Sequence, residues 1–223
     1  MRTRDVKRKN RPKKAALRGR RRKEGRPQEI LEAAFEEFAA NGFAATRLED
    51  VARRGGIAKG TIYLYFRDKA GLFRAVVRNM IQPVFENLAP FVERFPGSSK
   101  DLLRNLIARQ YAHVVGNEKA RAILRLLIAE SGNFPRLSEI FHREIIGPGV
   151  SVLRQVLSRG EASGEFRRSK VRDFPQIMIA PGVLAILWRL VHGDRNRLNL
   201  RAYMSAHTEF VLRALQEHRG EHP

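Results

Sequence analysis

The sequence has no cysteine, a single tryptophan and far fewer acidic than basic residues. Without cysteine the chain forms no disulfide and offers a metal no thiolate ligand. Its six histidines are scattered, and none belongs to the HExxH pattern of zinc hydrolases. No nucleophile–base pair and no phosphate-binding loop can be read from the sequence. These absences argue against an enzyme, including an all-helical one, and predict that the protein uses no cofactor and no metal.

Strand-like alternation, internal repeats and a secretory signal are also lacking. One apolar stretch, residues 174–191, falls short of about 20 uninterrupted apolar residues. It is interrupted by Gln176, Pro181 and Arg189. We therefore predict a buried helix there instead of a membrane span. The fold class indicated is all-α, and the expected location is the cytoplasm.

Positive charge is concentrated at the N-terminus. The net charge is +20, and residues 1–26 hold 14 of the 43 Lys and Arg but only 2 of the 23 Asp and Glu. This segment, the basic arm, thus carries +12. With few apolar residues it should be disordered when free. Such an arm either follows phosphates or enters the minor groove of DNA, or it merely keeps the chain soluble.

After the arm, residues 27–40 have the pattern of an amphipathic helix. Pro27 suits its first position, and Asn41-Gly42 suits its end. Phe43 should lie in the core. One face is apolar and the other carries Glu29, Glu32, Glu36 and Glu37. Because phosphates repel carboxylates, we expect the acidic face to point away from DNA.

Two shorter helices follow around a glycine corner. Thr46 and Glu49 fit a capping box that starts the first of them. Gly55 and Gly56 can supply the positive φ of a sharp turn. Residues 59–66 then form a second helix whose inner face carries Ile62 and Phe66. Its outer face carries residue types that suit phosphates and base edges, namely Lys59, Thr61, Tyr63 and Tyr65.

The segment ILEAAFEEFAANGFAATRLEDVARRGGIAKGTIYLYFRDKAGLF carries a family pattern. Residues 28–73 resemble the DNA-binding domain of TetR-type one-component transcriptional regulators, in which an aromatic run close to YYHF precedes a lysine. Here the run is YLYF, at residues 63–66, followed by Lys69. The sequence departs from the pattern at Ala58, where a Ser or Thr N-cap is common, and at Gly71, where a Glu often stands.

The resemblance implies a helix-turn-helix placed in the major groove, with Lys69 on a phosphate. Core or plain surface roles remain the alternatives for Lys59, Tyr63 and Tyr65, and a solvated surface position remains the alternative for Lys69. The residues expected to contact DNA are Thr46, Arg47, Lys59, Gly60, Thr61, Tyr63, Tyr65 and Lys69.

Helical spacing continues to the C-terminus. We predict about nine helices in all, with a helix-turn-helix domain at residues 27–73 and a helical effector-binding and dimerisation domain at residues 74–223. The later helices are expected at residues 69–91 with a kink at Pro83, 101–115, 118–130, 134–157 with a break at 147–149, 173–191 and 200–216.

The resemblance further implies a homodimer, formed through the last two helices, and a small-molecule pocket in each subunit. A monomer in which these helices simply complete the core is the alternative. The effector should be hydrophobic or amphipathic, and each candidate pocket residue has a plain core role as its alternative. These candidates are Phe85, Tyr111, His113, Phe134, Phe141 and Trp188.

The function expected is that of a repressor released from a palindromic operator by its effector. The alternative is an architectural DNA-binding protein that coats DNA without sequence preference.

Overall fold

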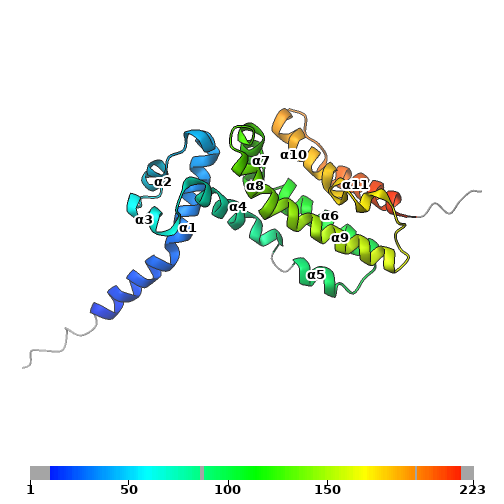
Figure 1. Cartoon of the computed structure of the whole chain (residues 1–223), viewed down its shortest axis with the longest axis horizontal. Helices are drawn as coiled ribbons and strands as arrows, with labels where there is room; N and C mark the ends of the chain where they lie inside the picture. The colour runs from blue at the N-terminus through cyan, green and yellow to red at the C-terminus, as the bar shows by residue number, and fades with distance from the viewer. Residues whose placement is uncertain (1–10, 86–87, 194, 217–223) are drawn as a thin grey trace, which may run out of the picture. The chain divides into compact units, whose positions relative to one another are not determined.

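The computed structural model describes the backbone of residues 11–85, 88–193 and 195–216, and side chains from Arg26 onward apart from residues 81–87. All regular structure in these ranges is helical, which confirms the all-α class. The chain divides between Val76 and Val77 into two compact units, within which the helices of Figure 1 pack. The division falls three residues after the predicted domain boundary.

The first unit holds three helices and the start of a fourth. Their bounds are α1 Arg11–Ala45, α2 Leu48–Arg54, α3 Lys59–Tyr65 and α4 Lys69–Phe85. The centre of the unit is an aromatic triad of Phe38, Phe43 and Phe73, whose ring centroids lie 5.3 to 5.8 Å apart. Phe43 is buried, as predicted. The triad ties the end of α1 to the start of α4, and α2 and α3 pack beside it.

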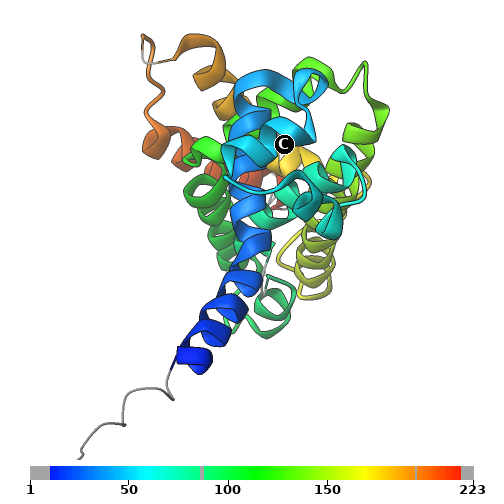
Figure 2. The ribbon, with the colours of Figure 1, turned by 90° about the vertical axis from the view of Figure 1, so that its left-hand side faces the viewer.

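Helix α1 begins earlier than the sequence predicts. Its ribbon runs unbroken from Arg11, so Pro27 lies inside the helix instead of at its start (Figure 2). Lys, Ala, Leu and Arg dominate residues 13–23, and these are among the best helix formers. The expected disorder of the basic arm therefore does not describe residues 11–26, while residues 1–10 lie outside the described part. Gly42, where the helix was predicted to end, adopts a φ of 79° and kinks the helix there, but α1 continues to Ala45.

The corner between α2 and α3 differs from the prediction in two details. The N-cap of α2 is Arg47, and no side chain caps the helix, so the predicted capping box is absent. Of the two glycines at this corner, Gly55 and Gly56, only Gly56 has a positive φ, 59°. At Gly55 space is tight instead, because a Cβ there would lie 2.9 Å from Ile57 Cδ1 and 3.2 Å from the Cβ of Ala33 on α1.

The second unit contains the remaining helices. Eleven α-helices are present over the described residues instead of about nine, partly because a separate α5 follows α4, with residues 86–87 between them undescribed. The further bounds are α5 Leu88–Arg94, α6 Ser99–Gln110, α7 Glu118–Glu130, α8 Pro135–Phe141, α9 Gly147–Ala162, α10 Ala180–His192 and α11 Leu200–Leu215. Helix α6 packs against both α9 and α11 (Figure 1). All three contribute side chains to one apolar core.

Four short segments in this unit depart from regular α geometry. They are η1 Tyr111–Val115 and η2 His142–Ile146, both single π turns, and the 3₁₀ segments η3 Lys170–Arg172 and η4 Pro175–Ile179. The turn η2 stands directly before the Gly147-Pro148-Gly149 sequence, where a break was predicted, and α9 starts at that sequence. Isolated π turns within helices frequently accompany functional sites.

Helix α10 is only half covered within one chain. Gly182, Ala185 and Ile186 are buried, but Leu184 and Val191 are exposed, so the prediction of a buried helix holds for one face only. Within the described residues Pro175–His192 is long and apolar enough to cross a membrane, judged by length and composition alone. The structure divides that stretch between η4 and α10.

Candidate DNA-binding surface

Helix α3 presents one buried pole and one exposed pole. Ile62 is fully buried, while Tyr63, Leu64 and Tyr65 are exposed. Because successive residues rotate by about 100°, Ile62 fixes which residues face outward. The predicted orientation of the two tyrosines is therefore what the structure shows. Ala58 is the N-cap and makes no side-chain bond, as its departure from the family pattern suggested.

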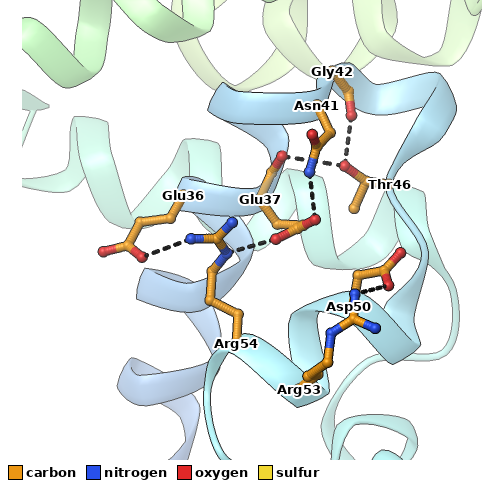
Figure 3. A network of polar contacts seen from close by, with 8 residues as sticks. All are labelled: Glu36, Glu37, Asn41, Gly42, Thr46, Asp50, Arg53 and Arg54. Carbon is orange, nitrogen blue, oxygen red and sulfur yellow. Dashed lines mark hydrogen bonds and ion pairs between the residues drawn. The ribbon is translucent and has the colours of Figure 1, made fainter.

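A buried carboxylate fixes α2 against α1. Glu37 accepts hydrogen bonds from Asn41 Nδ2 and from Arg54 Nε, both at 2.5 Å. Arg54 also lies 3.5 Å from Glu36 (Figure 3). Glu37 was expected on the solvated acidic face of α1, and that expectation is wrong because the side chain is buried and paired with α2. The pairing raises the pKa of the Arg54 guanidinium through its hydrogen bond to Glu37.

An ion pair joins α2 to the first turn of α3. The Lys59 ammonium contacts the Glu49 carboxylate, and it also lies 6.0 Å from the centroid of the Tyr63 ring. The hydrogen bond between them raises the pKa of Lys59 and lowers that of Glu49. Glu49, expected to cap α2, thus acts as the counter-ion of Lys59.

Two residues expected to hold phosphates are engaged inside the unit. Thr46 is buried, and its hydroxyl donates to the Gly42 carbonyl at 2.6 Å. The Lys69 ammonium donates to the carbonyls of Phe43, Ala44 and Thr46 at 2.6, 3.0 and 2.9 Å. In this conformation the donor groups of both side chains bond to the chain itself, and a phosphate contact by either stays a prediction.

The remaining expected DNA contacts lie at the surface. Arg47 is exposed at the start of α2, and Gly60 and Thr61 stand in the first turn of α3. A Cβ added at Gly60 would meet nothing within 4 Å, so the backbone there is open to a close partner. Leu64 is exposed to 82% but was not among the residues expected to contact DNA.

The start of α4 matches its prediction. Asp68 caps the helix through its carboxylate, which accepts from the Gly71 amide at 2.6 Å.

The second unit buries a polar pair within its core. Tyr111 on η1 lies 3.1 Å from His207 Nδ1, and His207 Nε2 lies 2.7 Å from the Met178 carbonyl oxygen. A carbonyl only accepts, so Nε2 carries the proton and Nδ1 accepts from the tyrosine hydroxyl. Burial raises the pKa of Tyr111 to about 12 and lowers the pKa of His207. Both groups are therefore neutral near pH 7.

The other candidate effector residues do not gather around this pair. His113 is exposed, and Trp188 is half-buried with its indole N–H donating to the Asn196 carbonyl at 2.9 Å. Phe134 and Phe141 are half-buried at the two ends of α8. The side chain of Phe85 lies outside the described part. A groove of about 630 Å³ runs between α6 and α11, and the candidate residues contribute nothing to its lining.

A polar link connects α4 to η2 within the second unit. Arg78 Nε and Nη2 donate to the two carboxylate oxygens of Glu144 at 3.0 and 3.3 Å. Glu144 is buried, whereas Arg78 is largely exposed. This pair could not be predicted from the sequence, because 66 residues separate its members.

Comparison with known proteins decides the family. Residues 30–76 match the model of bacterial regulatory proteins of the tetR family, and residues 98–199 match that of the tetracyclin repressor-like C-terminal domain. The chain belongs to the TetR family. This TetR-family protein is therefore a DNA-binding transcriptional regulator, and α2 and α3 form its helix-turn-helix.

Two curated relatives resemble this regulator over most of its length. It is 27% identical to the fatty acid metabolism regulator protein of Bacillus subtilis over 153 residues, 65% of this chain and 74% of the relative. It is 29% identical to the probable acrEF/envCD operon repressor of Escherichia coli K12 over 159 residues, 68% and 70% of the two chains.

Solved structures share the fold. The structure of the regulator FadR from Bacillus subtilis in complex with stearoyl-CoA matches with a TM-score of 0.69 at 21% identity. The match covers 85% of this chain and 99% of that one.

Proposed function

We propose that this TetR-family regulator is a homodimeric repressor that binds a palindromic operator and is released by a hydrophobic or amphipathic effector. The observation that carries the proposal is the outward face of α3, where Tyr63 and Tyr65 are exposed opposite a fully buried Ile62. Such a face suits the major groove, and a two-fold dimer presents two of them to a palindrome. The operon repressor among its relatives supports repression over activation.

The proposed dimer is supported by apolar side chains left uncovered at the end of the chain. Five large ones are at least half exposed from the N-cap of η4 through α10 to α11, namely Phe174, Ile177, Leu184, Val191 and Phe210. Exposed apolar groups in such number usually mark an interface. A second copy of the chain is the proposed cover. Light scattering that shows a monomer at micromolar concentration would contradict it, and Leu184→Arg should convert a dimer to monomers.

The proposed effector acts on the second unit. The regulator FadR was solved with stearoyl-CoA, and a fatty acid metabolism regulator is among the relatives, so a long-chain acyl-CoA is the first effector to test. A ligand lowers operator occupancy only if it binds the free form more tightly than the DNA-bound form. Tyr111, Phe134, Phe141 and Trp188 remain the proposed lining, together with His113 and Phe85.

The decisive experiment is selection of duplexes from random DNA by the full-length protein, followed by titration in a gel shift. We expect a palindromic consensus, and Tyr63→Ala should cost roughly 1–3 kcal/mol of affinity for it. Stearoyl-CoA should weaken the complex, with lauric acid and free CoA as matched controls. Retention of duplexes without any consensus, with steep salt dependence, would support the architectural alternative. Removal of residues 1–26 should lower the salt slope if the basic arm touches phosphates.

A further inference from the structure

Leu64 occupies the outermost position of α3. At 82% exposed it is the most exposed large apolar side chain in the described part of the molecule. It follows the fully buried Ile62 by two residues, a rotation of about 200°, so it points almost directly away from the core. A leucine held at this pole makes no packing contribution to its own domain, and its apolar surface is available to a partner.

The surroundings of Leu64 favour close approach by that partner. Gly60 lies one turn earlier on the same strip, and space beyond its Cα is open. Tyr63 and Tyr65 stand on either side of the strip, and Lys59 lies beside Tyr63. The strip thus consists of the Leu64 side chain and the exposed backbone of Gly60, and it is flanked by side chains that can bind phosphate. This combination fits a groove of DNA better than a protein surface, where Lys59 and two phenols would be desolvated.

Base edges in the major groove offer hydrogen-bonding groups and one apolar group, the C5-methyl of thymine. The leucine side chain can neither donate nor accept a hydrogen bond, so the thymine methyl is the group on a base edge with which it makes a favourable contact. We propose that Leu64 reads a thymine methyl in each half-site of the operator. This inference rests on the proposed function, because it assigns one base of the sequence that α3 reads.

The test removes the methyl without altering hydrogen bonding. Each thymine of the selected operator is replaced in turn by deoxyuridine, which keeps the O4 acceptor, and affinity is measured by fluorescence anisotropy at fixed salt. For wild type, one symmetric position should weaken binding by about fourfold per half-site, the value of one buried methyl. Leu64→Ala should bind the thymine operator and the operator with deoxyuridine at that position with equal affinity. Because Leu64 is exposed, this variant should keep the wild-type melting temperature.

Two variants serve as controls. Ile128→Ala removes another exposed aliphatic side chain, on α7 in the second unit, and should keep the wild-type response to deoxyuridine. Tyr63→Ala should weaken both operators and preserve their ratio. The inference is overturned if wild type ignores every methyl, if Leu64→Ala keeps the ratio, or if Tyr63→Ala abolishes it. Absence of any consensus from random DNA would instead remove the proposed function, and this inference with it.

Discussion

Replacement of Lys69 by methionine distinguishes a structural clamp from a phosphate contact. The ammonium donates to three carbonyls that lie 23 to 26 residues earlier in the chain, and it sits 4.6 Å from the Phe43 ring centroid. Charged hydrogen bonds contribute about 1.5–3 kcal/mol, and the ring contact adds about 0.5–1 kcal/mol. The carbonyls regain some hydration in the variant, and the dipole of α4 disfavours a lysine in its first turn by about 0.3–1 kcal/mol.

A net loss of roughly 2 kcal/mol follows for the first unit. With a slope near 1 kcal/mol per M of urea for so small a unit, its midpoint should fall by about 2 M. Because Trp188 lies in the second unit, its fluorescence should keep the wild-type midpoint, whereas amide exchange at residues 43–47 should accelerate. Arg67→Met, which removes the same charge from an exposed neighbouring residue, is the matched control and should leave the first unit unchanged.

A phosphate contact predicts a different outcome for Lys69→Met. Affinity would fall equally for all DNA sequences, the salt slope would drop by about one, and stability would not change. If both variants unfold at the wild-type midpoint, the clamp contributes nothing and the reasoning from the three carbonyl bonds is refuted.

Three further predictions follow from other contacts. Glu49→Gln should strengthen DNA binding in a gel shift, since it frees Lys59 from its counter-ion and removes a negative charge beside the phosphates; unchanged affinity would count against that competition. The native state should lose stability as pH falls below about 6.5, because burial lowers the pKa of His207 and only the unfolded state then gains the proton. His207→Gln should flatten this part of the plot of urea midpoint against pH. An unaltered plot would refute the assignment to His207. Gly160→Ala should destabilise the second unit by roughly 2–3 kcal/mol, seen by Trp188 fluorescence, because its Cβ would lie 2.0 Å from the Phe166 ring; a wild-type midpoint would show that the ring relocates freely.

The sequence predicted those features of the helix-turn-helix that depend on near neighbours. Helical spacing placed Ile62 inward and the two tyrosines outward, and Gly42 interrupted the geometry of α1 where its end was expected, because periodicity and glycine conformation act over a few residues. The partners of Glu37 and Lys69 were not predictable in this way. Arg54 follows Glu37 by 17 residues, and only the folded corner brings them together.

Leu64 was missed for a different reason. Its position in the helix implied exposure as clearly as for the tyrosines, but leucine lacks the hydrogen-bonding groups by which candidate DNA contacts were chosen. The effector residues were chosen by residue type, apolar or aromatic, within the domain that the resemblance implies, and residue type does not separate a core side chain such as Tyr111 from an exposed one such as His113. The choice of candidate DNA contacts and the choice of candidate effector residues were therefore both limited by reliance on residue type. Helical spacing was not the source of either limitation.

Several basic side chains of the helix-turn-helix form bonds within the first unit. Arg54 is paired with Glu37 and Lys59 with Glu49, and the Lys69 ammonium is held by backbone carbonyls, so three basic side chains around the corner are engaged within the unit. What α3 shows to solvent is largely aromatic and aliphatic. Such a surface discriminates between base sequences but contributes little to long-range attraction. The strongly basic residues 1–26 can supply that attraction, and we therefore expect affinity and specificity to reside in different segments of the first unit.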